Sequence, residues 1–372
     1  MKANQSVKSW SWLMLLGLLL TGSTTFVSCS SEDNPSVKPQ TLTEEEEEIQ
    51  YFLNKANERE NVNSDERATK YAPYKEWRRD SEAGDEPLFN LRLTIADFDF
   101  TTENAKELPD PDYVPTRQGF DDLTISGSAR PNKLQLAALA DTLKKVAGSL
   151  PIIIVDLRTE MHGIINGHHL SQYGFQNWGT IGMTREEIIE KEKEVVHSTL
   201  GKTITHAKIG SSTNYEPADP KEEEVTEALT MEEATEAAGL KYYRITALDH
   251  VFQSDETLDS FFEFYRSLPA EGTWLHFHCQ AGRGRTTFFM SVTDMLNNPG
   301  VSLKDILHRQ VLIGGTSMYN DGTGQPEWRQ LLFKEISVML PIVYQYIQEN
   351  AENGYTVKWS SWKLFKYGYL LN

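Results

Sequence analysis

One stretch of the sequence, residues 274–296, constrains the fold more than any other. Residues 274–278 are bulky and β-prone, which predicts a strand. Gly282 and Gly284 then predict a sharp turn, and the apolar residues 288–296 predict a helix. A strand that turns directly into an apolar helix is typical of an α/β protein. We therefore expect a central, mostly parallel sheet flanked by helices.

The turn itself has the composition of an anion-binding loop. Cys279 ends the predicted strand and Arg285 begins the predicted helix. Glycines allow successive backbone N–H groups to point inward, and the start of a helix carries a partial positive charge. The result is a cup for one phosphate dianion, which Arg285 can close by a bidentate grip on two phosphoryl oxygens. The loop residues expected to contact the phosphate are Gln280, Ala281, Gly282, Arg283 and Gly284.

Cys279 is the candidate nucleophile of this loop. The positive field that binds a phosphate also favours the thiolate form of a cysteine. Thr286 follows Arg285 and is expected to hydrogen-bond the sulfur, and His278 is a candidate supporting residue. Two simpler interpretations are a buried core cysteine and a phosphate-binding turn without chemistry. The joint presence of Cys279, Arg285 and Thr286 at these offsets favours the catalytic interpretation.

Cleavage of a phosphate ester by a thiolate also requires a proton donor for the leaving oxygen. Asp249 directly follows the predicted strand 242–248 and is the candidate general acid. Asp255 and Asp259 are competitors, but they lie in the first turns of a helix that Ser254 caps, and capping explains them.

Charge and cysteine content exclude several other classes of function. The chain has 372 residues and a formal net charge of -18, which argues against binding nucleic acid through bulk charge. Its two cysteines, Cys29 and Cys279, form no zinc or iron–sulfur spacing. A metal site built from His162, His168 and His169 is disfavoured, because the sequence offers no convincing ligand geometry. We expect no metal and no other cofactor.

The N-terminus predicts export and a lipid anchor. Lys2 and Lys8 precede the apolar run 10–20, which is too short to span a membrane. Residues 26–29, FVSC, resemble a bacterial lipobox, whose cysteine is lipidated. We therefore expect a signal peptide at 1–28, a lipidated Cys29 and a flexible acidic tether at 29–48. The protein would be an outer-membrane lipoprotein on the periplasmic or cell-surface face, attached to the membrane only through its lipid; an ordinary cleavable signal is the alternative.

A second polar cluster follows another apolar run. Residues 151–155, PIIIV, predict a buried parallel strand, and DLRTEMHG follows it. Open α/β sheets bind their ligands at the carboxyl ends of such strands. Asp156 and His162 are therefore candidates for substrate contacts or for a structural network. Arg158 and Glu160 fit a structural network better.

Several motifs together resemble one enzyme family. The sequence HCQAGRGRTT contains H-C-x5-R-[ST], the signature of the cysteine-dependent protein tyrosine phosphatase superfamily, and it is most similar to the protein tyrosine phosphatase-like phytases. Those bacterial enzymes are inositol polyphosphate phosphatases. Further similar elements are NLR at 90–92, SGSA at 126–129, DLRTEMHG at 156–163, LDHVFQ at 248–253 and RQVLIGG at 309–315.

The resemblance implies a phosphatase domain at 49–372. Its core would comprise about 126–163 and 225–372, and a small β-rich partial barrel would come from about 87–125 and 164–215. It also implies removal of phosphates from myo-inositol polyphosphates, either phytate or less phosphorylated forms, through a cysteinyl-phosphate intermediate and without a cofactor. The partner would be a small anionic phosphate ester; the sequence makes no prediction of the oligomeric state. Further substrate contacts implied by the family are Arg92, His250 and Gln310.

The chain departs from this family at two points. In the segment LDHVFQ, which carries the candidate acid Asp249, Phe252 and Gln253 replace the usual Trp-Pro. The segment 316–328 contains no lysine, whereas the best-known relatives have a lysine-rich stretch there. Either Arg283 and Arg329 supply the missing basic contacts, or the substrate carries fewer phosphates. A protein tyrosine phosphatase and a non-catalytic phosphate-binding lipoprotein remain as alternatives, although no phosphotyrosine-recognition loop is recognisable.

Overall fold

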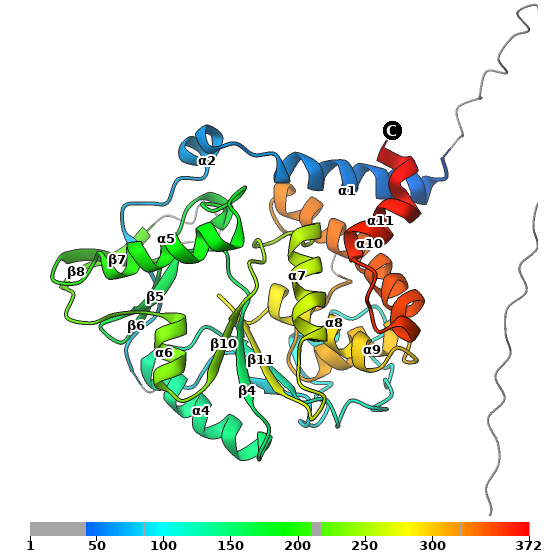
Figure 1. Cartoon of the computed structure of the whole chain (residues 1–372), viewed down its shortest axis with the longest axis horizontal. Helices are drawn as coiled ribbons and strands as arrows, with labels where there is room; N and C mark the ends of the chain where they lie inside the picture. Colours follow the sequence, from blue (N-terminus) through cyan, green and yellow to red (C-terminus); the bar gives the residue numbers. More distant parts are fainter. Residues whose placement is uncertain (1–41, 85, 210–216, 320–321, 372) are drawn as a thin grey trace, which may run out of the picture. The chain divides into compact units, whose positions relative to one another are not determined.

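Two β-sheets with helices around them organise the chain in a computed structural model (Figure 1). The structure describes residues 42–84, 86–209, 217–319 and 322–371. The predicted signal peptide at 1–28, Cys29 and most of the predicted tether lie outside the described residues. Among the described helices, none combines the length and apolarity that crossing a bilayer requires.

The central sheet has the strand order β10-β4-β11-β3-β2. Its strands are β10 (Lys241–Arg244), β4 (Ile152–Asp156), β11 (Trp274–Cys279), β3 (Ile125–Ala129) and β2 (Arg92–Leu93). The first four run parallel, and β2 is an antiparallel edge strand. The strand β11 lies between β4 and β3 and is buried along its whole length. The expected parallel-centred α/β sheet, with Cys279 at the carboxyl end of an inner strand, is confirmed.

Helices cover both faces of this sheet (Figure 1). Trp274 packs with Leu139 and Leu143 of α4 on one face. On the other face Phe277 contacts Phe261 of α7, which in turn contacts Phe289 of α8. Alternate side chains of a strand point to opposite faces, so β11 contributes to the core on both sides. The helices are α1 (Glu44–Glu60), α2 (Ser64–Lys70), α3 (Glu103–Lys106), α4 (Lys133–Ala147), α5 (Arg185–His197), α6 (Met231–Ala237), α7 (Asp255–Arg266), α8 (Gly284–Asn297), α9 (Leu303–Leu312), α10 (Glu327–Asn350) and α11 (Trp359–Tyr367), with 3-10 turns η1 (Phe175–Asn177), η2 (Ala351–Asn353) and η3 (Gly368–Leu371).

The helix starts follow local capping rules. Thr184 and Thr230 form the capping boxes of α5 and α6, and Ser254 caps α7 as predicted. The predicted tether is one turn too long, because α1 already begins at Glu44. Thr43 and Glu46 form a capping box there, and the glutamates of the first turn favour the positive end of the helix.

The second sheet has the order β8-β7-β1-β6-β5-β9 and is not a closed barrel. Its strands are β1 (Trp77–Ser81), β5 (His162–Ile165), β6 (His168–Ser171), β7 (Thr203–Ile209), β8 (Pro217–Glu224) and β9 (Ala228–Thr230). The segment 87–125 does not belong to it, contrary to the prediction. The chain turns at Asn90, whose φ is 55°, and only the short strand β2 follows, which pairs with β3.

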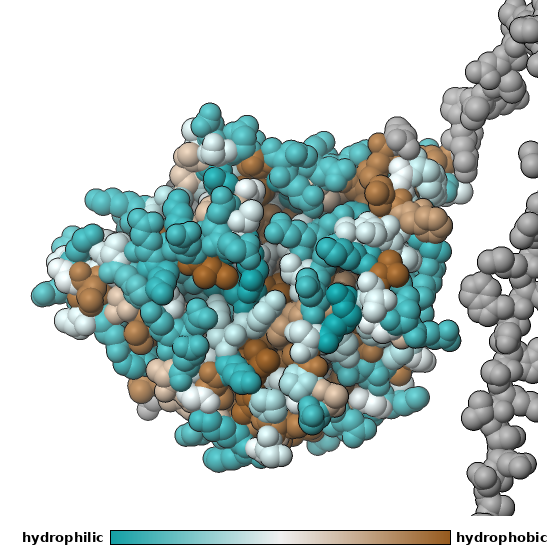
Figure 2. Space-filling view, viewed as in Figure 1, coloured by the Kyte–Doolittle hydropathy of each residue, from teal (hydrophilic) through white to brown (hydrophobic). Residues whose placement is uncertain are grey.

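Hydrophilic residues dominate the face shown in Figure 2, with apolar residues scattered between them. This distribution agrees with the formal net charge of -18. An anionic ligand must therefore be held by a local cluster of cations and backbone donors.

Candidate active site

The phosphate loop, residues 279–285, connects β11 to α8. Its Gly282 has a φ of 67°, and a Cβ atom there would lie 2.3 Å from the backbone nitrogen of Ala129. The carbonyl of Ala281 accepts a hydrogen bond from Asn90 Nδ2 at 2.8 Å, and that of Gly282 accepts one from Arg92 at 2.7 Å. In a trans peptide the N–H points opposite to the C=O. The N–H groups of Gly282 and Arg283 therefore point away from Asn90 and Arg92, as an anion cup requires.

Arg285 stands at the start of α8 and is held by a carboxylate beneath the loop. Its two terminal nitrogens donate to the two oxygens of Glu160 at 2.6 and 2.8 Å. Its Nε lies 3.2 Å from Oδ1 of Asp249. Burial would lower the pKa of Arg285, but Asp249 and Glu160 outweigh it and raise the pKa. Glu160, predicted as structural, thus fixes the plane of the guanidinium group.

Asp249 lies at the start of the acid loop, residues 248–254. Asn177 Nδ2 donates to its Oδ2 at 3.2 Å, and Trp178 Nε1 donates to its backbone carbonyl at 2.9 Å. Burial would raise the pKa of Asp249, but Arg285 and then His250 outweigh it and lower the pKa. Asp249 is therefore an ionised partner of Arg285.

Asn177 and Trp178 were not predicted as functional residues. They belong to or follow η1, in a segment that the sequence marks only as a loop insertion. Gln176 and Asn177 both have positive φ, at 56° and 64°. In the sequence, these two residues stand out only as an Asn–Trp pair in a loop rich in glycine and aromatic residues. That pattern does not predict their contact with Asp249.

Asp156 and His162 form a buried network instead of lining the site. Oδ2 of Asp156 is 2.8 Å from His162 Nε2, 2.9 Å from the Tyr242 hydroxyl and 3.0 Å from Arg244. Both side chains are fully buried. We therefore correct the expected substrate contacts: these residues, with Arg244 and Glu192, support the strand ends beneath the loop.

Arg92 and Gln310 are also placed behind the loop. Arg92 donates to Gly282 as described and to Thr287 Oγ1 at 3.2 Å. Gln310 is fully buried, and its Nε2 donates to Asp294 at 3.2 Å. Neither side chain lines the cavity that contains Cys279, so the predicted substrate contacts are corrected. Arg92 supports the phosphate loop through Gly282, and Gln310 contacts Asp294. The sequence pattern identified their importance but not the direction in which they point.

Thr286 and His278 are both buried. The hydroxyl of Thr286 has no hydrogen-bond partner within the described part of the chain, so the predicted hydrogen bond to the sulfur of Cys279 is not formed. The neighbouring Thr287 instead links Arg92 to the backbone of Thr316. Burial lowers the pKa of His278 to about 4, so this imidazole is neutral at neutral pH.

The remaining predicted residues converge on one cavity of about 550 Å³. The residues of the sequence prediction that line it are Cys279, Gln280, Ala281, Arg283, Gly284, Arg285, Asp249 and His250. Phe89, Asn104, Glu107, Thr316 and Arg329 are further lining residues, and all come from other segments. The cavity therefore combines a thiol, a fixed guanidinium and a carboxyl group with two more arginines at its walls.

The histidines considered as metal ligands are committed to other partners. His169 stacks on His162 at 5.1 Å and bonds to Arg158 and to the carbonyl of Pro131. A different group, His168, His206 and Glu223, has ligand atoms within 4.8 Å of one another in the second sheet.

Tautomers explain this second group without a metal. Nδ1 of His168 accepts from the backbone N–H of Ala83, and Nδ1 of His206 accepts from Arg79. Each neutral ring therefore carries its proton on Nε2, which faces Glu223 at 3.6 and 3.1 Å. A nitrogen that carries its proton cannot coordinate a metal. The arrangement is therefore accounted for by these tautomers, with a hydrogen bond from His206 to Glu223.

The fold and the loop define a protein tyrosine phosphatase-like α/β architecture. Comparisons with known proteins show which members of that class the chain is similar to. The family model PTPlike_phytase, described by the words "Inositol hexakisphosphate", matches residues 155–297. The tandemly repeated protein tyrosine phosphatase-like phytase from Mitsuokella multacida is 37% identical, with a TM-score of 0.74 over 79% of this chain and 49% of that chain. The phytase of this type from Bdellovibrio bacteriovorus is 25% identical, with a TM-score of 0.57 over 79% of this chain and 97% of that chain.

A curated relative is the effector protein hopD2 of Pseudomonas syringae pv. tomato, which is 24% identical over 249 residues, 66% of this chain and 52% of that protein. The chain thus spans about half the length of the curated relative and of the Mitsuokella protein. In the matched segment and in its fold, the chain is thus similar to the protein tyrosine phosphatase-like phytases.

Proposed function

We propose that the protein is a cysteine-dependent phosphomonoesterase that removes phosphates from myo-inositol polyphosphates. The observation that carries the proposal is the convergence of Cys279, Arg285 and Asp249 on one cavity. A Mitsuokella multacida relative with 37% identity has been solved in complex with myo-inositol-(1,3,4,5)-tetrakisphosphate, which supports this substrate class.

In the proposed reaction the thiolate of Cys279 attacks phosphorus in line with the leaving oxygen. Arg285 and the N–H groups of the phosphate loop hold the non-bridging oxygens. Asp249 donates a proton to the leaving oxygen as the P–O bond breaks, and a cysteinyl-phosphate forms. Water then attacks the phosphorus while Asp249 accepts its proton, which releases phosphate and restores the thiolate.

The pairing of Asp249 with Arg285 explains how the acid acquires its proton. In the free site Arg285 lowers the pKa of Asp249. A phosphate dianion bound to Arg285 neutralises that cation and places negative charge next to the carboxylate. Both changes raise the pKa of Asp249, because like charges favour the neutral acid. Substrate binding itself therefore protonates the general acid.

The walls of the cavity favour a substrate with few phosphates. Beyond Arg285, its basic side chains within the described residues are Arg283, Arg329 and His250. Burial outweighs Asp249 and lowers the pKa of His250, so it is neutral at neutral pH. Glu107 adds a negative charge to the same wall. We infer that two phosphates besides the reacting one can be neutralised, which suits partly phosphorylated inositols better than phytate.

We also propose that Cys29 carries the lipid that attaches the protein to the outer membrane. The support is the sequence FVSC after a short apolar run. Metabolic labelling with a palmitate analogue should mark the wild-type protein and not Cys29→Ala, while Cys279→Ser remains labelled. Equal labelling of all three would exclude Cys29 as the acceptor.

The activity is tested by phosphate release from three substrates. These are inositol hexakisphosphate, inositol-(1,3,4,5)-tetrakisphosphate and a phosphotyrosine peptide, each with the wild type and Cys279→Ser. We expect turnover of both inositol phosphates, faster for the tetrakisphosphate, and none by the variant. Turnover of the peptide alone would support the protein tyrosine phosphatase alternative. Turnover that survives Cys279→Ser would refute the mechanism, and no turnover of any substrate would refute the enzyme.

A further inference from the structure

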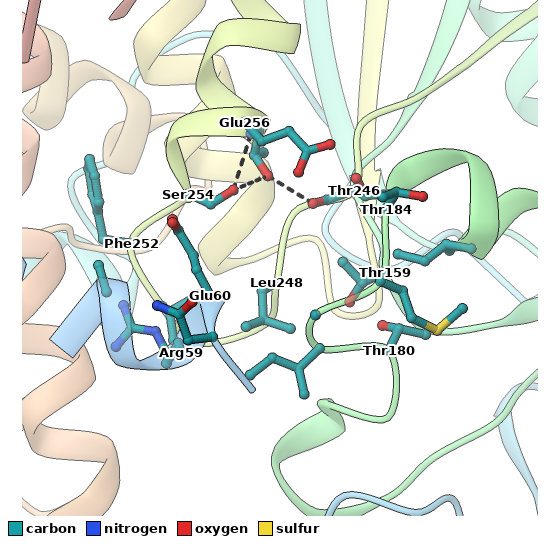
Figure 3. A pocket seen from close by; sticks show the side chains of 18 residues that line it. Arg59, Glu60, Thr159, Thr180, Thr184, Thr246, Leu248, Phe252, Ser254 and Glu256 are labelled. Carbon is teal, nitrogen blue, oxygen red and sulfur yellow. Dashed lines mark hydrogen bonds between the residues drawn. The ribbon is translucent and has the colours of Figure 1, made fainter. Parts of the chain in front are cut away.

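A second cavity, of about 420 Å³, lies behind the acid loop (Figure 3). Its walls come from the end of α1, the segment 180–184, the start of α7 and the acid loop itself. Val251 lines both this cavity and the catalytic one. The volume is within the range of small-molecule sites, about 300–1,000 Å³.

Two hydroxyls in this cavity lack partners. Thr159 and Thr180 are each only 5% exposed, and their Oγ1 atoms make no hydrogen bond in the part of the chain that the structure describes. Figure 3 shows both side chains on one wall, opposite Glu60 and Phe252. Buried hydroxyls are normally hydrogen-bonded, so two unpartnered ones in the same cavity indicate a ligand that supplies the missing bonds.

The charges of the cavity exclude an anion and disfavour a cation. Among the described residues that line it, the one basic side chain is Arg59, which forms an ion pair with Glu335, and Glu60 and Glu256 are carboxylates on its walls. Burial and then the charge of Asp255 raise the pKa of Glu60, and Lys363 offsets only part of this rise. Glu60 therefore keeps its proton more readily than a free carboxyl group and attracts a cation less strongly.

A neutral molecule with several hydroxyls fits the remaining chemistry. Carboxylate oxygens accept from its hydroxyls, and threonine hydroxyls donate to or accept from them. Leu248, Ile181 and Val251 provide apolar surface for the C–H faces of a ring. We propose that this cavity, here named the polyol site, binds a small neutral polyhydroxylated ring of the cyclitol or sugar class.

The polyol site adjoins the catalytic machinery at two points. The acid loop forms one of its walls, and the backbone N–H of Thr159 donates to Oε2 of Glu160 at 3.0 Å. Glu160 is the carboxylate that holds Arg285. A bound polyol is therefore expected to slow amide hydrogen exchange in residues 248–254. The proposal does not rest on the proposed function, because the site contains neither Cys279 nor Arg285.

Binding is tested with myo-inositol, which carries no phosphate to cleave. It is titrated into the full chain, followed by saturation-transfer NMR, with inorganic phosphate present to occupy the catalytic cavity. Binding should persist in phosphate, weaken about tenfold in Thr180→Val, as the loss of one hydrogen bond predicts, and disappear in Ala56→Trp, which fills the cavity. The Thr180 hydroxyl has no partner to lose, so Thr180→Val should fold with an undiminished midpoint of thermal unfolding.

A matched control exists in Thr235 of α6. Its hydroxyl is also buried and unpartnered within the described chain, but it does not line the cavity, so Thr235→Val should bind myo-inositol as the wild type does. The proposal is wrong if the wild type does not bind, if phosphate displaces the ligand, or if Thr180→Val and Ala56→Trp bind as the wild type does. Preferential binding of tetramethylammonium would overturn the assignment to neutral polyols.

Discussion

Replacement of Glu160 by glutamine tests whether the carboxylate beneath the phosphate loop positions Arg285. Glu160 accepts two short hydrogen bonds from Arg285, and its Oε1 is also 3.4 Å from Nε of Arg158. Glutamine keeps one acceptor oxygen and presents an NH2 group to the second donor. Breaking a buried ion pair costs about 3–5 kcal/mol. We expect about 3 kcal/mol, because Asp249 and Asp80 still partly compensate the two arginines.

Activity should fall more than stability alone explains. Without Glu160 the guanidinium group turns towards Asp249, and a displacement of about 1 Å at such a position costs about 100-fold in rate. The assay is kcat for inositol tetrakisphosphate at a temperature where the variant is fully folded, alongside urea unfolding. The loss of activity should appear as a lower kcat and not only as a higher KM, since Arg285 acts on the transition state.

Glu192→Gln is the matched control for Glu160→Gln. Glu192 is also a buried partner of an arginine, Arg244, but it does not contact Arg285. Both variants should lose comparable free energy of unfolding, and only Glu160→Gln should lose about two orders of magnitude in kcat. Equal losses of kcat in the two variants, or full activity in Glu160→Gln, would refute the positioning role.

Three further variants test the loop and the acid. Asp249→Asn should lower kcat about 10²–10⁴-fold and remove the decline of kcat as pH rises through the pKa of the acid in the complex. Folding lowers the pKa of Asp249 below its ordinary 3.8, so the ionised form stabilises the fold above that pH. The midpoints of thermal unfolding of Asp249→Asn and of the wild type should therefore converge as the pH falls below about 4. Arg283→Ala should raise KM for inositol tetrakisphosphate about 10–100-fold, far more than KM for p-nitrophenyl phosphate, as the loss of one charge-assisted contact predicts; equal effects would exclude contact with a second phosphate. Gly282→Ala should abolish turnover and destabilise the protein, because its φ of 67° and the 2.3 Å approach to Ala129 leave no room for a methyl group; an active variant would show that the loop can shift.

The parts of the fold that were predictable depend on neighbours in sequence. The strand–loop–helix around Cys279 has its β-prone run, its glycines and its apolar helix within one short stretch. Helix starts at Thr184 and Thr230 follow from residues three positions apart. Such signals are local, so a single sequence contains them in full.

The parts that were missed depend on partners far away in sequence. The strand β1 reads WRRDS and looks exposed, yet Arg79 and Asp80 are buried because Asp219, Arg78 and Arg158 pair with them. Nothing near residue 80 indicates these partners. In the same way, the directions of Arg92 and Asn177 follow from Gly282 and Asp249, which tertiary structure alone brings close.

The ion pair between Asp249 and Arg285 has a consequence for which esters can enter the site. The guanidinium group is already neutralised by Glu160 and Asp249, so an incoming anion must compete with an internal carboxylate. A singly charged phosphodiester or sulfate ester offers no more charge than Asp249 itself. A phosphomonoester dianion offers twice as much and can take over the contact. We therefore expect the ion pair to favour phosphomonoesters over diesters at the binding step, before the reaction begins.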